Sequence, residues 1–153
     1  MIDSFKGEHQ FLSNFYNVPG GIAYDGAIYP TVENAFQAAK TLDLEERKHF
    51  ETITPAAARA RGRKVDLRKN WDYDRVDVMR ELVVLKFSVP ELSEKLLATG
   101  DEQIVEGNAS HDRHWGTCRC PKHQGDGLNW LGRILMRVRK ELKVQDPTET
   151  NAA

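Results

Sequence analysis

The stretch "YPTVENAFQAAK", Tyr29 to Lys40, predicts a helix with two different faces. Glu33, Gln37 and Lys40 recur at helical spacing and form a polar stripe, with one polar residue per turn. The neighbouring face is apolar and is formed by Val32, Ala35, Phe36 and Ala39. Thr31 precedes the first helical position, where a threonine side chain can cap the helix. The polar stripe is either the solvated side of this helix or part of a site.

The two ends of the polar stripe carry an acid and an amine. Glu33 lies in the first turn, where the helix dipole favours a carboxylate, and Lys40 lies about 10 Å further along the axis. Helical side chains lean toward the N-terminus, so Lys40 leans toward Gln37 and Glu33. Small neighbours favour partial desolvation of Lys40, which would lower its pKa and make the amine a usable nucleophile. Spacing alone nevertheless favours the solvated face, because Glu and Lys are common on exposed helices.

The flanking sequence predicts an α+β fold that is mainly helical. "GIAYDGAIYP" has the pattern of a hairpin with Asp25-Gly26 as its turn, which gives a small antiparallel sheet. The central core helix is expected within "YDRVDVMRELVVLKFSV", where one stripe is formed by Val76, Met79, Val83 and Lys86/Phe87. Further helices are expected from Pro55, after the Thr54 cap, to the residue before Gly62, then from Pro90 to Ala98, and within "NWLGRILMRVRKEL". We expect a single domain over residues 1–144 and a flexible tail over 145–153.

Composition points to an ordinary soluble domain. The 153 residues are 40% hydrophobic and 29% charged, and the net charge of −1 gives no argument for nucleic-acid or membrane partners. No apolar run is as long as a membrane span, and "MIDSFKGEHQF" lacks the apolar part of a signal peptide. Cys118 and Cys120 are too close to cross-link a fold usefully, so a reducing, cytoplasmic setting is expected.

Two further segments each allow a functional and a structural interpretation. In "FLSNFY", Ser13 and Asn14 could bond sugar hydroxyls, or they could form a turn between buried rings. The basic run from Arg59 to Lys69 suits a phosphate-bearing ligand, but it also suits a solvated loop. Trp71 could stack on a base or cover the core. The residues by themselves leave these alternatives open.

The segment "SHDRHWGTCRCPKHQGDGLNWLG" has little periodicity, and long irregular stretches inside compact domains are usually functional. Cys118, Cys120 and His123, with His111 or His114, have the composition of a metal site. Structural zinc sites prefer Cys-x₂₋₄-Cys spacing and four ligands, which Cys-x-Cys matches poorly. We therefore predict no metal and no other cofactor, with zinc as the alternative.

Taken in order, the motifs resemble the NADAR family, which includes bacterial N-glycosidases acting on riboflavin-pathway intermediates. The resemblance covers roughly Phe5 to Leu142, through "FLSNFY", "YPTVENAFQAAK", "AARARGRKVDLRKNWD", "LLATGDEQIVEGNASHDRHWG" and "GLNWLGRILMRVRKEL". The segment "TCRCPKHQGDG" departs from the short Gly-rich link of many relatives. The role of the cysteines therefore does not follow from the resemblance.

The resemblance implies roles for particular residues. It implies that Glu33 is needed for activity and that Lys40 is a Schiff-base nucleophile, so these two are the predicted catalytic residues. The segment around Asn14 matches the part of relatives that meets the ribose-phosphate side, and Asp112 matches a pocket position. The predicted substrate-binding residues are Ser13, Asn14, Phe15, Phe36, Gln37, Arg68, Trp71, Asp112, Trp115, Gly116 and Asn129.

The predicted function is hydrolysis of an N-glycosyl bond between ribose C1′ and an exocyclic amine. The expected partner is a phosphorylated ribosyl substrate: a ribosylaminopyrimidine phosphate of riboflavin synthesis, or ADP-ribosylated guanine in DNA or RNA. No membrane partner is expected. The alternative is a non-catalytic module that binds ADP-ribose or modified nucleic acid, for which a nucleophilic amine at Lys40 would be unnecessary. A zinc-stabilised interaction domain is the third hypothesis and rests on Cys118, Cys120 and His123 alone.

Overall fold

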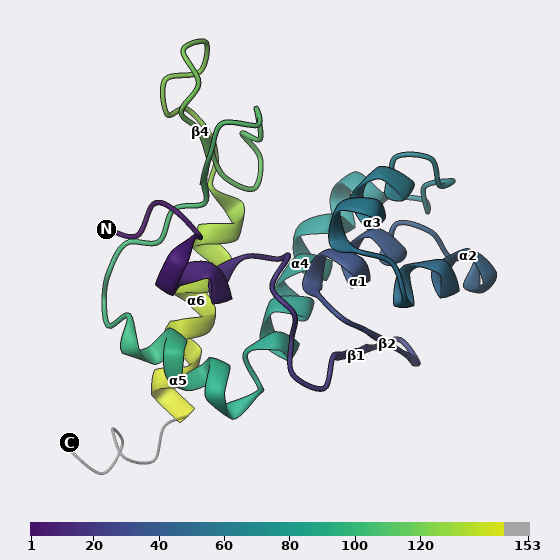
Figure 1. The fold of residues 1–153 in the computed structure, drawn as a ribbon, viewed down its shortest axis with the longest axis horizontal. Coiled ribbons are helices and arrows are strands. Elements are labelled where there is room, and N and C mark those ends of the chain that lie inside the picture. Colours follow the sequence, from purple (N-terminus) through teal and green to yellow (C-terminus); the bar gives the residue numbers. More distant parts are fainter. Residues whose placement is uncertain (146–153) are drawn as a thin grey trace. The chain divides into compact units, whose positions relative to one another are not determined.

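The computed structural model describes residues 1–145, which form two compact units. The hairpin unit is Asn14–Val89, and the terminal unit joins Met1–Ser13 to the chain from Pro90 onward. Figure 1 shows that helices make up most of both units. The prediction of a mainly helical α+β fold with a small antiparallel sheet is confirmed. The predicted tail falls outside the described residues, apart from Gln145 at the end of the last helix.

The hairpin forms where the sequence predicts it. Strands β1 (Ile22–Tyr24) and β2 (Ala27–Tyr29) pair in antiparallel register. Asp25 and Gly26 between them have φ values of 49° and 87°. Positive φ at both central positions is the geometry that matches the strand twist in a two-residue turn.

Helix α1 (Val32–Ala39) is the most deeply buried helix of the hairpin unit. Its N-terminus is capped by Thr31, whose hydroxyl accepts from the Asn34 N–H at 3.0 Å. The Asn34 amide donates to the carbonyls of Phe50 (2.9 Å) and Ile53 (2.8 Å). These bonds tie α1 to the 3-10 helix η2 (His49–Glu51) and to the loop that follows it. Neither η2 nor the helix before it, α2 (Leu44–Lys48), was predicted from the sequence.

Two further helices pack against α1, as Figure 1 shows. Helix α3 (Pro55–Gly62) has the predicted Thr54 cap, but it includes Gly62 as its last residue instead of ending before it. Helix α4 (Trp71–Lys86) buries Met79 and Val83 as expected, whereas Val76 is only half-buried. Both helices contribute to the core, and α1 is the more completely buried of the two: all eight of its residues are buried, and it packs against α3, α4, α2, η2 and the hairpin.

The terminal unit is built on two helices and an extended N-terminus. Helix α5 (Pro90–Ala98) packs against α6 (Trp130–Gln145) and the 3-10 helix η1 (Gly7–Leu12). The apolar side chains along α6 face the core: Leu142 is half-buried, and the others are buried, namely Leu131, Ile134, Leu135 and Val138. The short strands β3 (Gly107–Asn108) and β4 (Thr117–Cys118) pair in parallel, which the sequence analysis did not predict. Across residues 1–145, none of the helices combines the length and apolarity needed to cross a bilayer.

One buried lysine makes stability depend on pH. Lys86 on α4 is 1% exposed, and its Nζ lies 5.2 Å from the Phe87 ring centre and 5.7 Å from that of Tyr16. Burial lowers the pKa of its amine from 10.5 to about 7. Between these two values the unfolded chain binds more protons than the folded chain. The free energy of unfolding should therefore rise with pH across this window.

We expect Lys86→Met to remove this pH dependence, which amounts to at most about 1.4 kcal/mol for each pH unit. The measurement is urea unfolding of wild type and variant at several pH values between neutral and pH 9. Lys69→Met, at an exposed lysine of the same unit, should keep the wild-type slope. Parallel wild-type and Lys86→Met curves would show that Lys86 stays charged in the folded protein.

Candidate active site

The polar stripe on α1 is not a solvated helix face. Glu33 is 3% exposed and Gln37 is 5% exposed, so both polar side chains lie inside the hairpin unit. Lys40 is half-buried and forms the C-cap of α1, with helical backbone angles. A buried carboxylate is costly unless it is paired and hydrogen-bonded, so the partners of Glu33 decide what it can do.

Glu33 is the centre of a hydrogen-bonded network. Its Oε1 accepts from Gln37 Nε2 at 2.9 Å and from Arg59 Nε at 3.1 Å. The Arg59 side chain is 48% exposed, and its guanidinium lies 4.7 Å from the centre of the Phe15 ring. The Glu33 backbone N–H donates to the Asn14 carbonyl at 3.0 Å. The structure thus brings Asn14, Phe15 and Gln37 together with Glu33, and places a partly exposed cation beside the buried carboxylate.

The surroundings of Lys40 shift its amine toward the neutral form. Burial lowers the pKa of Lys40 below its ordinary value. The Glu33 carboxylate opposes this effect, whereas the guanidinium groups of Arg63, Arg59 and Arg75 lower the pKa further. The expected desolvation of Lys40 is therefore present, and a larger fraction of its amine is unprotonated than in an exposed lysine.

The close approach of α3 to α1 depends on a residue without a side chain. A Cβ atom on Gly62 would lie 1.8 Å from Gln37 Oε1, a distance that excludes any side chain unless Gln37 moves. Gln37 Oε1 is buried and has no hydrogen-bond partner among the described residues. Gly62 therefore lets Gln37 hold the orientation in which its amide donates to Glu33.

Arg68 packs against the C-terminal end of α1 and holds the backbone of Lys40. The Arg68 backbone N–H donates to the Lys40 carbonyl at 2.7 Å, and the Arg68 side chain donates to the Ala39 carbonyl at 3.3 Å. The Arg68 guanidinium lies 5.7 Å from the centre of the Trp71 indole. Trp71 is only 5% exposed and packs on Phe36 with ring centres 5.2 Å apart. Of the two interpretations of Trp71, this burial favours covering the core over stacking on a base.

The basic run does not act as one group. Arg59 pairs with Glu33, and Arg61 pairs with Glu46 at 2.7 Å. Arg68 lies 3.6 Å from an Asp74 carboxylate oxygen. The remaining members are exposed and form no ion pair within residues 1–145: Arg63, Lys64 and Lys69. Arg59 was predicted as part of this run and not as part of the site, and Arg75, whose charge also acts on Lys40, was not predicted at all. Arg59 lies on another helix than Glu33, so local periodicity gave no signal for their contact.

The other predicted substrate-binding residues lie in the terminal unit, where several hold the backbone. Asp112 Oδ1 accepts from the backbone N–H groups of His114 (3.0 Å) and Trp115 (2.9 Å). Gly116 is buried, and a Cβ there would lie 2.0 Å from the Glu106 carbonyl oxygen. These contacts build a tight turn and leave Trp115 half-buried.

Asn129 and Ser13 also have local structural contacts. Asn129 is 9% exposed, accepts from the Glu106 N–H at 2.9 Å and donates to the Ile104 carbonyl at 3.0 Å. Both ends of its side chain thus anchor the chain ahead of α6. Ser13 follows η1, and its backbone N–H donates to the Gln10 carbonyl. The roles of these two residues toward a substrate remain predictions.

Comparison with known proteins gives the family. The profile of the NADAR domain matches residues 3–143. N-glycosidase YbiA of Escherichia coli (strain K12) is 37% identical over 146 residues, which are 93% of this chain and 87% of that protein. An N-glycosidase of Nostoc punctiforme is 38% identical over 139 residues, covering 86% of this chain and 85% of that protein. The NMR structure of E. coli YbiA matches with a TM-score of 0.75 at 33% identity, over 95% of this chain and 88% of that one.

The chain belongs to the NADAR family, as its motifs predicted. The predicted enzyme class, a hydrolase acting on N-glycosyl bonds, is confirmed by the names of these relatives. A riboflavin biosynthesis protein of Vibrio vulnificus is also 38% identical over 144 residues, which are 91% of this chain and 37% of that protein.

Proposed function

We propose that the chain cleaves the bond between ribose C1′ and an exocyclic amine in a phosphorylated ribosyl substrate, through a Schiff base on Lys40. The observation that carries the proposal is the half-buried Lys40, whose pKa is lowered by burial. The charge of the buried Glu33 carboxylate also affects this pKa, so the two groups lie within range of an electrostatic interaction. An amine with a lowered pKa near a positioned carboxylate suits nucleophilic catalysis with proton transfer. A purely binding module would have no use for such an amine.

The chemistry balances without any oxidant or reductant. The glycosylamine ring opens to an imine between C1′ and the exocyclic nitrogen. The neutral Lys40 Nζ attacks C1′, the exocyclic nitrogen leaves as a free amine after it gains a proton, and C1′ becomes double-bonded to Nζ. Water then adds to C1′ and releases the sugar as its aldehyde, which restores the Lys40 amine. Glu33 would carry protons between these nitrogen and oxygen atoms and stabilise positive charge at C1′.

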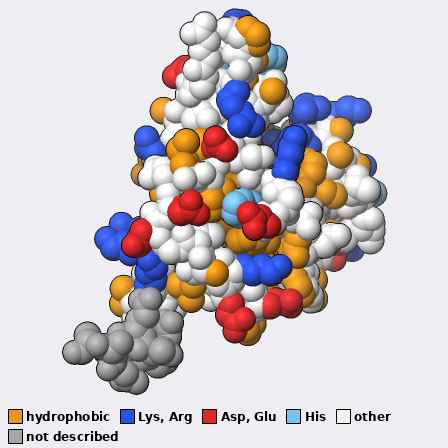
Figure 2. Space-filling model, turned by 60° about the vertical axis from the view of Figure 1, so that its left-hand side comes forward, with side chains coloured by type: hydrophobic (Ala, Val, Ile, Leu, Met, Phe, Trp, Pro, Cys, Tyr) orange, Lys and Arg blue, Asp and Glu red, His pale blue; other side chains and the backbone are white. Residues whose placement is uncertain are grey.

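The substrate we favour for this site is a ribosylaminopyrimidine phosphate. Relatives that match this chain are named N-glycosidase and riboflavin biosynthesis protein, and the exposed Arg63, whose charge acts on Lys40, offers a phosphate partner. On the face in Figure 2, basic and acidic side chains both occur, in keeping with a net charge of −1. Nucleic-acid backbones bind broad surfaces of positive charge. A net charge of −1 gives no reason to expect such a surface here. We propose the cytoplasm as the location, because both cysteines are free thiols.

The experiment that tests the proposal is one assay with two substrates. Ribosylaminopyrimidine phosphate and ADP-ribosylated guanine in DNA or RNA are incubated in parallel with the purified chain, and HPLC measures the released base and sugar. We expect release of the free amine and ribose phosphate from the pyrimidine. Release only from the modified nucleic acid would support the proposed reaction but show that ADP-ribosylated guanine, and not the pyrimidine, is the substrate. Binding of either compound without release would overturn the enzymatic proposal.

Arg63 provides a test of how phosphate is held. We expect Arg63→Ala to raise KM about tenfold, the effect of losing roughly 1.5 kcal/mol from a charged hydrogen bond. The same change removes a cation that lowers the pKa of Lys40, so the rise of kcat/KM with pH should shift to higher pH. Lys64→Ala removes an adjacent exposed charge and should leave both KM and the pH profile near wild type. Equal effects of the two variants would show only general electrostatic attraction.

A further inference from the structure

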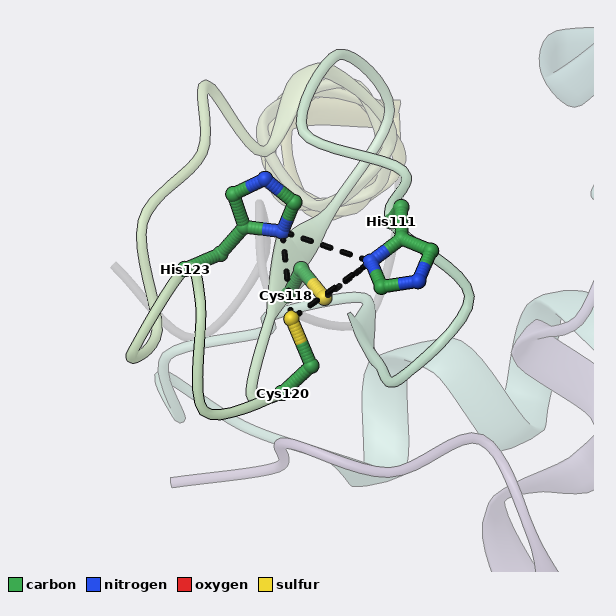
Figure 3. Close-up of side chains that lie close together, drawn as sticks. All are labelled: His111, Cys118, Cys120 and His123. Atoms are coloured by element: carbon green, nitrogen blue, oxygen red, sulfur yellow. Dashed lines mark hydrogen bonds between the residues drawn. The ribbon is translucent and has the colours of Figure 1, made fainter.

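Four metal-ligating side chains converge in the terminal unit, outside the proposed catalytic site. Figure 3 shows His111, Cys118, Cys120 and His123 directed toward one another. Their ligand atoms all lie within 4.8 Å of one another. Within residues 1–145 this is the one group of three or more His, Cys, Asp or Glu side chains arranged closely enough to share a metal ion.

The distances between the ligand atoms fit a tetrahedral zinc ion. Zn–S bonds of about 2.3 Å and Zn–N bonds of about 2.0–2.1 Å place sulfur and nitrogen about 3.6 Å apart, and two nitrogens about 3.3 Å apart. Three of the S···N distances in the cluster are 3.2, 3.4 and 3.9 Å. The two imidazole Nδ1 atoms are 3.4 Å apart. A single central ion therefore accounts for the measured separations.

Hydrogen bonds explain the cluster less well than an ion does. His111 Nδ1 faces three partners at once: Cys118 Sγ, Cys120 Sγ and His123 Nδ1. An imidazole nitrogen has one in-plane direction, occupied either by a lone pair or by N–H, and cannot bond well to three atoms spread around it. One ion at the centre uses that single direction of each nitrogen and the lone pairs of each sulfur.

The backbone shows how the fold assembles the cluster from a poor sequence spacing. Pairing of β3 with β4 sets Asn108 beside Cys118, and the Arg119 N–H donates to the Asn108 carbonyl at 2.8 Å. His111 follows three residues after Asn108, with φ of 69°. This pairing, which the Cys-x-Cys spacing does not reveal, selects His111 as the fourth side chain. His114 is excluded because its ring instead packs on Trp115, with ring centres 4.4 Å apart.

The second half of the cluster is a tight loop. Cys118 and Asp126 form an isolated antiparallel bridge, and the Gly125 N–H donates to the Cys118 carbonyl at 2.7 Å. The N–H groups of His123 and Gln124 both donate to the Cys120 carbonyl, at 3.1 and 2.8 Å. This turn directs Cys120 and His123 to the same side, so the two ligands are prearranged by the backbone.

The segment has little else to hold it together. Over residues 107–128, only Gly116 and Cys118 are buried, so no apolar side chain other than a thiol provides a core. Irregular segments with so little buried apolar surface commonly depend on a metal or a disulfide. Both cysteines are free thiols. A metal would therefore supply a cross-link that this loop otherwise lacks.

We propose that His111, Cys118, Cys120 and His123 bind one structural zinc ion. Two thiolates and two neutral imidazoles would give a site with no net charge around Zn²⁺, and binding would release the two thiol protons to solvent. Four protein ligands leave no open position, which marks a structural and not a catalytic site. The ion would order the segment that also carries Asp112, Trp115 and Gly116. This proposal is independent of the proposed N-glycosidase reaction.

The first test is the metal content of the full chain, purified under reducing conditions without a histidine tag or added metal. We expect about one zinc per chain by mass spectrometry of the metal. After zinc is exchanged for Co²⁺, we expect the visible absorption of tetrahedral cobalt and the near-ultraviolet charge-transfer band of thiolate ligation. Hydrogen exchange of residues 107–128 should be slow with zinc and fast after chelation, while exchange in α1 and α4 stays unchanged.

Matched variants separate this site from adventitious binding. We expect Cys118→Ser with Cys120→Ser to abolish the cobalt spectrum, and His49→Ala, at an exposed histidine of the hairpin unit, to leave it intact. Because the double variant can fail to fold, His111→Asn serves as a milder change at an exposed ligand. Loss of an outer-shell partner weakens metal binding by about 10–100-fold. Because His111 is proposed as a direct ligand, this variant should weaken zinc binding by at least about 100-fold. Zinc far below one equivalent in reduced wild type, or zinc unaffected by these variants, would overturn the proposal.

Discussion

Glu33→Gln should lower kcat by about 10²–10⁴-fold while the protein stays folded, which is the usual cost of losing a positioned proton-transfer group. The glutamine has nearly the same shape and can still accept a hydrogen bond from Arg59 or Gln37, but it has no charge and takes up no proton. The substitution also removes the carboxylate that raises the pKa of Lys40, so more of the lysine amine would be neutral. A large loss of rate despite a more neutral lysine would therefore identify the carboxylate itself as essential.

The measurement is steady-state release of base and sugar, with circular dichroism and thermal unfolding on the same preparations. Glu46→Gln is the matched control, because Glu46, like Glu33, is paired with an arginine of α3. Its partner is Arg61, which donates two hydrogen bonds to it at 2.7 and 3.3 Å. That variant breaks an ion pair in the same unit without touching the proposed site, and its kcat should be near wild type. A folded Glu33→Gln enzyme with kcat within a few-fold of wild type would rule out a catalytic role.

Lys40 should become covalently attached to the sugar during turnover. Borohydride reduces an imine to a stable amine, so its addition to the working enzyme should trap a ribosylated protein. Mass spectrometry of peptides should place the adduct on Lys40, whose pKa burial lowers. Lys64 and Lys69 are exposed lysines of the same unit and serve as internal controls that should remain unlabelled.

The matching variant is Lys40→Arg, which keeps a positive charge but has no amine able to form an imine. We expect kcat to fall by roughly 10³-fold or more, because loss of the nucleophile removes the whole covalent route. Trapping should disappear in the same variant. Unlabelled Lys40 during active turnover, or a Lys40→Arg enzyme with near-normal kcat, would exclude the Schiff base.

Local features of the chain followed from the sequence because their causes lie within a few residues. Asp25-Gly26 allows positive φ at both turn positions, which fixes the hairpin. Thr31 and Thr54 cap the helices that follow them. The spacing of Glu33, Gln37 and Lys40 places them along one stripe, and the ordered motifs indicate the NADAR family that the comparisons show.

Whether that stripe is solvated or buried depends on distant segments. Glu33 is buried because neighbouring elements cover α1, and its cationic partner Arg59 comes from a helix 26 residues further along the chain. Gly62 permits this approach because a side chain there would collide with Gln37. No local pattern reports which arginine of a basic run reaches a given carboxylate. That choice is made when helices pack, since burial requires the charge to be paired.

The cysteine segment shows the same division. The sequence by itself determined the ligand types in "SHDRHWGTCRCPKHQGDG" and also the poor Cys-x-Cys spacing that argued against zinc. Only the tertiary structure decided that β3 and β4 pair, which brings His111 beside Cys118, Cys120 and His123. Metal sites depend on distances of a few ångströms between side chains, and these distances are set by backbone pairing between segments and not by spacing within one of them.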